Sequence, residues 1–147
     1  MDSAETATYG RNIWAEQSVV GSMLIDPRVT GLVMANLTES DFLLEADRRL
    51  FRAFQTRFAA NQTIDPVLVI ESAGPEDGVL RSYALQLMDT TPTAANVAEY
   101  IEVVRENTRT AKGRSLGQEI ASSPTSEDIG RLFQQGLDLM SNRGRDD

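Results

Sequence analysis

The feature that most constrains the fold is a helical apolar pattern in the second half of the chain. Along residues 92–121, apolar or small side chains recur at spacings of four, three, four and three: Val97, Ile101, Val104, Thr108 and Ala111. This spacing places them in one seam along an α-helix, and such a seam packs against another helix. The pattern therefore predicts a long helix that needs a partner helix, from its own chain or from a neighbour.

A second amphipathic segment supplies a candidate partner. Residues 122–126 form a turn rich in helix-capping side chains. Residues 127–140 then place apolar side chains on one side of a helix, at Ile129, Leu132, Phe133, Leu137 and Met140. The two segments predict a helical hairpin over residues 91–141. Gly113 and Gly117 weaken the longer helix and allow a kink or an early end.

The sequence before the hairpin predicts a compact body over residues 12–90. Expected helices span about residues 12–25, 28–37, 46–60, 67–72 and 79–88. Asn12 is the expected cap of the first helix, and Glu16 in its first turn suits the helix dipole. The third helix carries a core stripe of Leu50, Phe51, Phe54 and Phe58.

The resulting fold class is all-α, a compact helical bundle followed by a C-terminal helical hairpin. The only short β-branched run, residues 67–70, lies among helix-capping signals. We expect a flexible N-terminal segment over residues 1–11 and a tail leading to a linker over residues 142–147.

Composition argues against catalysis by this chain. The sequence has no cysteine and no histidine, which excludes disulfides, zinc sites built on thiolate or imidazole, and histidine-based catalysis. No phosphate-binding fingerprint is present. We therefore predict no catalytic, cofactor-binding or metal residues. The net charge of −8 opposes binding to nucleic-acid phosphates and favours a protein partner.

The same sequence gives no sign of a membrane segment. No apolar run approaches the roughly 20 residues that a membrane-spanning helix needs. The first ten residues lack the charged and then apolar layout of a signal peptide. We expect a cytoplasmic protein.

Basic side chains cluster on two helices, and each cluster has two interpretations. Arg48, Arg49, Arg52 and Arg57 lie on the third helix, and Arg105, Arg109 and Lys112 flank the seam of the long helix. They either contact an acidic partner or pair with neighbouring carboxylates, as in Glu106 with Arg109. Pairing is favoured for the third helix, and the long helix stays open because charges beside a seam often set helix pairing.

These patterns define the expected self-association or partner-binding surface. On the long helix it comprises Val97, Ile101, Val104, Arg105, Thr108 and Arg109, and on the last helix Ile129, Leu132, Phe133 and Leu137. How the seam divides between the chain's own last helix and a neighbouring copy is left open by the sequence.

Several short motifs occur in the order found in one known family. The segment beginning Ala15-Glu-Gln resembles the "AEQ" helix that opens DnaB-type replicative DNA helicases, and Glu39-Ser-Asp-Phe42 resembles that family's "PEDF" turn. Thr91-Pro-Thr-Ala-Ala-Asn96, followed by Tyr100-Ile-Glu-Val-Val-Arg-Glu106, is similar to "TPSAAN…Y..IVRE". Two departures stand out: Asp47 occupies a position where the family often has histidine, and Pro66 follows the "ID" where leucine is usual. The resemblance covers about residues 13–140.

The resemblance implies a role in assembly. It implies an N-terminal collar domain that pairs through its helical hairpin, as a homodimer or as a hexamer built from three dimers. It also implies docking of primase and, as a further candidate, of a helicase loader. ATP and Mg²⁺ are expected only in the motor domain of a parent ATP-dependent DNA helicase. The alternatives are a primase C-terminal helicase-binding domain and a stand-alone helical adaptor or regulator.

Overall fold

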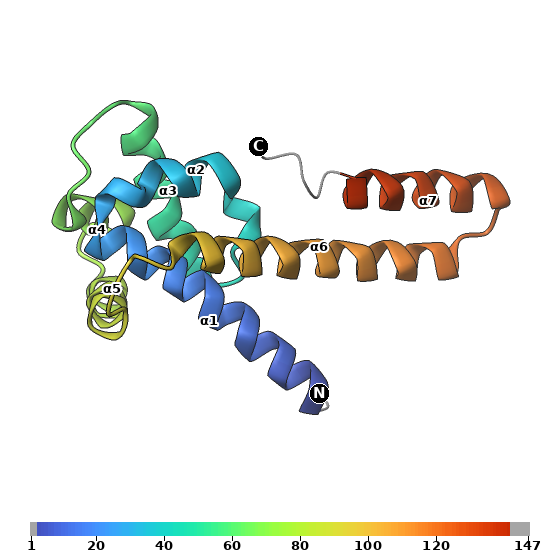
Figure 1. Cartoon of the computed structure of the whole chain (residues 1–147), viewed down its shortest axis with the longest axis horizontal. Helices are drawn as coiled ribbons and strands as arrows, with labels where there is room; N and C mark the ends of the chain where they lie inside the picture. Colours follow the sequence, from blue (N-terminus) through green and yellow to red (C-terminus); the bar gives the residue numbers. More distant parts are fainter. Residues whose placement is uncertain (1–2, 142–147) are drawn as a thin grey trace. The chain divides into compact units, whose positions relative to one another are not determined.

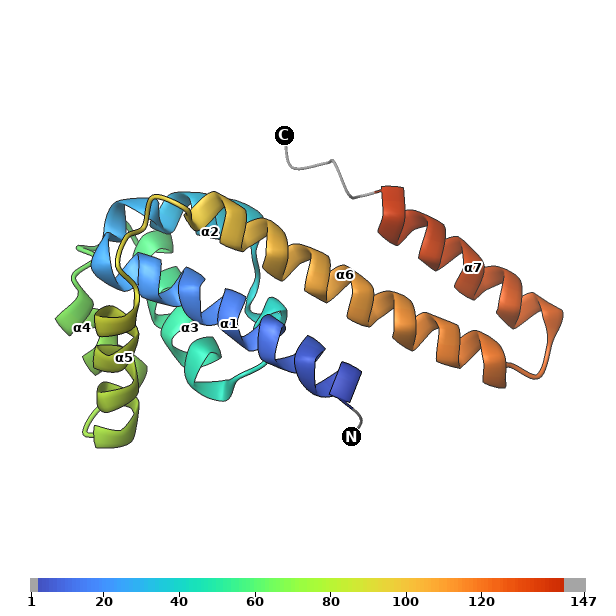
Figure 2. The same cartoon turned by 60° about the horizontal axis from the view of Figure 1, so that its bottom comes forward.

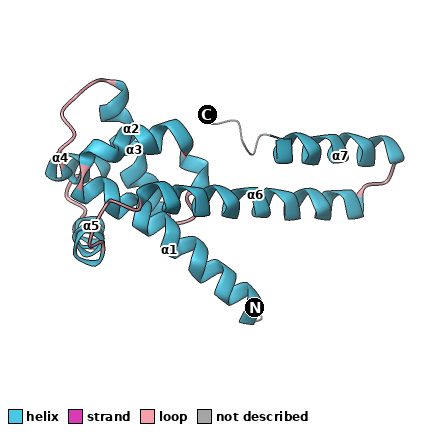
Figure 3. Cartoon of the chain, in the orientation of Figure 1, coloured by secondary structure: helices cyan, strands magenta, loops and turns pink. Residues whose placement is uncertain are grey.

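Every regular element of the described chain is a helix, as Figure 3 shows. The computed structural model describes the backbone of residues 3–141 and the side chains of residues 13–141. The all-α prediction is confirmed. The chain divides into two compact units, Met1–Val104 and Arg105–Asp147. The predicted tail at 142–147, and the start of the predicted flexible segment at 1–11, lie outside the described residues.

The first unit contains five helices and the start of a sixth (Figure 1). They are α1 (Ser3–Ile25), α2 (Thr30–Asn36), α3 (Glu45–Ala59), α4 (Pro66–Ala73), α5 (Gly78–Thr90) and α6 (Val97–Ser122), with short 3₁₀ helices at Pro27–Val29 and Glu39–Asp41. Local signals fix several of the starts. The Asp65 carboxylate accepts a hydrogen bond from the Val67 N–H at 2.9 Å, and Asp77 accepts one from the Leu80 N–H at 3.0 Å.

The predicted beginning of the first helix was wrong. Because α1 begins at Ser3, Asn12 is not a cap and Glu16 lies inside the helix. Glu16 is buried, and its carboxylate accepts hydrogen bonds from the backbone N–H groups of Leu43 at 2.6 Å and Leu44 at 3.0 Å. Glu16 therefore anchors the extended segment that leads into α3, because its carboxylate binds the backbone of the two residues that precede that helix.

The expected start of the long helix near residue 92 was also too early. The Thr93 hydroxyl accepts a hydrogen bond from the Ala95 N–H at 3.0 Å, which makes a turn. The Asn96 carbonyl then accepts from the N–H groups of Glu99 and Tyr100. The helix accordingly begins at Val97, after the turn that the proline opens.

The core of the first unit is built from apolar side chains of all its helices. Phe42 and Phe51 are in contact, with ring centroids 4.9 Å apart, and Leu50 and Phe54 are fully buried beside them. Each large side chain buried in this way stabilises the fold by roughly 1.5–3 kcal/mol. Phe58 departs from the predicted stripe, because it is 45% exposed near the end of α3.

The second unit contains the remainder of α6 and α7 (Ser126–Ser141). Figures 1 and 2 both show α7 returning antiparallel beside α6. The Thr125 hydroxyl caps α7 by accepting a hydrogen bond from the Asp128 N–H at 3.1 Å. The long helix continues through Gly113 and Gly117, so it has neither of the breaks that these glycines allow.

The boundary between the two units lies at Val104, inside α6, whereas the sequence placed it near residue 91. The reason is that the first turns of α6 belong to the core of the first unit. Among the described residues, no single helix is long and apolar enough to cross a membrane. Ile13–Ile25 and Pro27–Asn36 meet that criterion only as a pair, across a bend of 117°.

Candidate protein-interaction surface

One side of α7 exposes a row of large apolar side chains. Phe133, Leu137 and Met140 follow one another at helical spacing and are 59%, 63% and 49% exposed. We call these three residues the α7 apolar face. Their neighbours Leu132 and Ile129 are buried and partly buried. The chain itself therefore covers only part of the apolar stripe of α7. Adjacent exposed apolar side chains of this kind mark interaction sites.

The predicted seam of α6 is divided between two environments. Val97, Ile101 and Val104 are at most 4% exposed and lie in the core of the first unit. Their side chains are covered by the chain's own helices, which leaves none of the three on a surface that a partner can reach. Thr108 is partly buried and Ala111 is exposed.

The charged residues beside the seam are also engaged. Arg109 is buried and forms an ion pair with Glu106 on the same helix, so the predicted pairing of these two residues is confirmed. Arg105 is partly buried. Of the ten predicted surface residues, Phe133 and Leu137 are the two that remain widely exposed. A role of the predicted set in self-association stays a prediction.

The arginine cluster of α3 is mostly paired with carboxylates. Arg48 binds Glu45 at 2.9 Å and Arg49 binds Asp77 at 2.9 Å. Arg52 forms its ion pair with Glu39. The interpretation of a paired surface is confirmed for these three residues. Arg57 differs, because its guanidinium donates to the Thr63 carbonyl at 3.0 Å and lies 3.5 Å from the Ser72 hydroxyl.

A buried polar network joins α1, α3 and α5. The Tyr83 hydroxyl donates to Asp47 Oδ1 at 2.6 Å, and the Gln17 amide donates to the Tyr83 oxygen at 3.2 Å. Asp47 is fully buried, and its Oδ2 has no hydrogen-bond partner among the described residues. The pKa of Asp47 is raised to about 9, chiefly by burial and also by the neighbouring Glu16 carboxyl, and the Tyr83 hydroxyl offsets only part of this rise.

Asp47 is therefore protonated at neutral pH. Burial and the hydrogen bond to Asp47 also raise the pKa of Tyr83. Sequence reasoning missed this network because its members are distant along the chain. The one local signal was Asp47 itself, which stands where the DnaB-type family often has histidine. Among the described residues, no group of three or more acidic side chains gathers as a metal site.

The fold and these surfaces define a small all-helical domain that ends in a helical hairpin with an exposed apolar face. A sequence model of the DnaB-like helicase N terminal domain matches residues 10–106. The chain belongs to this family, which confirms the resemblance read from the motifs.

Relatives and a solved structure agree with this assignment. The replicative DNA helicase DnaB of Geobacillus stearothermophilus is 34% identical over 102 residues, covering 65% of this chain and 22% of the relative. That of Buchnera aphidicola subsp. Baizongia pistaciae is 24% identical over 134 residues, covering 88% and 28%. The chain thus spans about a quarter of the length of the curated relatives it matches.

The solved structure is the N-terminal domain of DnaB helicase from Mycobacterium tuberculosis. It superposes with a TM-score of 0.71 at 24% identity, and the match covers 84% of this chain and 94% of that chain. This similarity shows the shared fold.

Proposed function

We propose that this chain acts as the N-terminal collar domain of a replicative DNA helicase, in self-assembly and in docking of primase during DNA replication. Family membership carries the proposal, because the matching relatives are replicative helicases. It also favours the helicase domain over the primase helicase-binding domain. The collar works without bond-making of its own. ATP and Mg²⁺ act in the motor domain of the full-length helicase, in the cytoplasm.

Self-assembly is supported by the α7 apolar face. Phe133, Leu137 and Met140 leave apolar area open to water, and burying that area against a second copy is favourable. A two-fold pair is the simplest arrangement, since the same face then meets itself. Three such pairs make the proposed hexamer.

Docking of primase rests on the family and on the charge of the chain. The net charge of −8 disfavours direct contact with DNA phosphates, so the collar acts through proteins. A helicase loader is the further partner that we propose.

The self-assembly test uses Phe133→Asp combined with Leu137→Asp. Analytical ultracentrifugation should show concentration-dependent dimers of the wild-type chain and a monomeric variant, because a charge on the α7 apolar face has to be desolvated on pairing. Circular dichroism should show that the helicity of the variant is unchanged. Val79→Asp is the matched control, since Val79 is 83% exposed on α5, a helix of the first unit, whereas the α7 apolar face belongs to the second unit. A wild-type chain that stays monomeric at high concentration would contradict the assembly role and favour a stand-alone adaptor.

The docking test uses isothermal titration calorimetry of the wild-type chain with the primase of the same organism. We expect the wild-type chain to bind the primase saturably, and the Val79→Asp variant to bind it equally. Absence of binding, with both proteins folded by circular dichroism, would remove primase docking from the proposal and leave self-assembly to be judged separately.

A further inference from the structure

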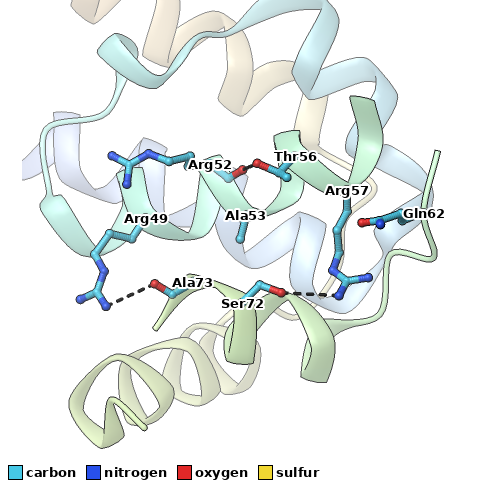
Figure 4. A pocket seen from close by; sticks show the side chains of 8 residues that line it. All are labelled: Arg49, Arg52, Ala53, Thr56, Arg57, Gln62, Ser72 and Ala73. Carbon is cyan, nitrogen blue, oxygen red and sulfur yellow. Dashed lines mark hydrogen bonds between the residues drawn. The ribbon is translucent and has the colours of Figure 1, made fainter. Parts of the chain in front are cut away.

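A cavity of about 200 Å³ opens between α3 and α4, and arginines are the only charged residues in its wall. Figure 4 shows the eight lining residues, which are Arg49, Arg52, Ala53, Thr56, Arg57, Gln62, Ser72 and Ala73. None of them is acidic, although the chain as a whole carries a charge of −8. The wall of the cavity is therefore locally positive, although the molecule as a whole is negative.

The charge of the wall is only partly neutralised from outside the cavity. Asp77 pairs with Arg49 at 2.9 Å, and Glu39 binds the Arg52 Nε at 3.0 Å. In the part of the chain that the structure describes, Arg57 has no carboxylate partner. Three guanidinium groups thus face two carboxylates, which leaves one net positive charge centred on Arg57.

Arg57 is also incompletely hydrogen-bonded. Its two terminal nitrogens contact the Thr63 carbonyl and the Ser72 hydroxyl, but its Nε is buried and has no partner among the described residues. The exposed side-chain amide of Gln62 makes no hydrogen bond within those residues either, and Figure 4 shows it beside the Arg57 guanidinium. A buried donor without an acceptor is costly, so the site favours a ligand rich in acceptor atoms.

We propose that this cavity binds one small phosphate-type oxyanion, with Arg57 as its principal cation and Gln62 as a neutral donor. Each guanidinium carries five N–H donors. Arg49 uses some of them on Asp77 and on the Ala73 carbonyl, and Arg52 uses some on Glu39. A carboxylate with two oxygens is satisfied by a single guanidinium, whereas the four oxygens of a phosphate engage donors from several directions. The net charge of −8 disfavours a long polyanion such as a nucleic-acid backbone more strongly than a single small anion held at this local basic site.

The test is a titration of the ¹⁵N-labelled chain with sodium phosphate, followed by NMR at constant ionic strength. Saturable shifts are expected at the backbone amides of Arg57, Gln62 and Ser72 and at the Arg57 Nε–H. Arg57→Gln should weaken the apparent affinity at least tenfold. Arg57→Lys should fall between the two, because lysine keeps the charge and loses the planar fork.

Arg81→Gln serves as the matched control, since Arg81 is an exposed arginine of α5 that pairs with Glu71 outside the cavity. It should leave phosphate binding unchanged. Adenosine monophosphate in place of phosphate distinguishes a phosphate ester from the free ion, and either source at this site supports the proposal. Tighter binding of acetate than of phosphate, wild-type affinity in Arg57→Gln, or unsaturable shifts spread over all arginines would overturn it.

Discussion

Asp47 is the residue whose replacement tests the buried network most directly. Asp47→Asn keeps the shape of the side chain, and its amide oxygen still accepts the hydrogen bond that Tyr83 donates to Asp47 Oδ1 at 2.6 Å. The amide nitrogen takes the place of the protonated Oδ2 and carries hydrogen as that atom does, in the neighbourhood of the Glu16 carboxyl that contributes to the raised pKa of Asp47. What the substitution removes is the ability to ionise.

The magnitude follows from the pKa of Asp47, which rises from an ordinary value of 3.8 to about 9 in the folded protein. Below pH 3.8 the folded and the unfolded chains both hold the proton. Above that pH the unfolded chain releases it and the folded chain keeps it until about pH 9, so folding stability falls as pH rises. At about 1.4 kcal/mol for each pH unit, the interval from 3.8 to 7 amounts to about 4 kcal/mol. Asp47→Asn avoids this cost.

The assay is urea unfolding followed by circular dichroism at several values between pH 5 and pH 8. The advantage of Asp47→Asn over the wild type should grow from about 2 kcal/mol at pH 5 to about 4 kcal/mol at pH 7. Asp89→Asn, at an exposed carboxylate of α5, is the control and should follow the wild type. A variant whose stability changes with pH as steeply as that of the wild type would refute a protonated Asp47.

Two further substitutions test the packing of the first unit. Ile101→Ala should lower the free energy of unfolding by about 2–5 kcal/mol because Ile101 is 2% exposed in the core, whereas Val103→Ala, at a half-exposed position of the same helix, should cost far less. Equal losses in urea unfolding would place Ile101 outside the core. Gly21→Ala should destabilise by about 1–3 kcal/mol because its Cβ would lie 2.0 Å from the Thr91 hydroxyl oxygen, while Gly113→Ala, with no atom within 4 Å, should stabilise α6 by about 0.5–1 kcal/mol. If thermal melts showed that the two glycine variants change stability in the same direction, the close approach of α1 to Thr91 would be contradicted.

Local signals predicted the helices well because the signals and the structures they set are close in sequence. Asp65-Pro66 and the turn before α7 predicted the starts of α4 and α7 to within one residue of where these helices begin in the structure. The errors also have local causes. Helix-forming residues continue from Ser3 to Ile25, so the cap expected at Asn12 had no helix end to serve.

The candidate surface was predicted less well than the helices. The seam of α6 and the stripe of α7 both consist of apolar residues at helical spacing, so spacing alone cannot predict which of the two is buried within the chain. In the structure the first unit covers Val97, Ile101 and Val104, while Phe133 and Leu137 stay exposed. Arginine pairing on α3 was foreseen for Arg48, Arg49 and Arg52. Only Arg48 pairs within α3, with Glu45, whereas Asp77 and Glu39, the partners of the other two, lie outside that helix.

The sequence by itself determined that this chain is all-helical, where most of its helices lie, and which family it resembles. These properties follow from periodicity, capping residues and short motifs, each confined to a few neighbouring positions. Only the tertiary structure decided which apolar face is buried, that Glu16 binds the backbone just before α3, and that Asp47 holds its proton. Burial and pKa depend on what distant parts of the chain bring within a few ångströms, and periodicity along one helix does not contain that information.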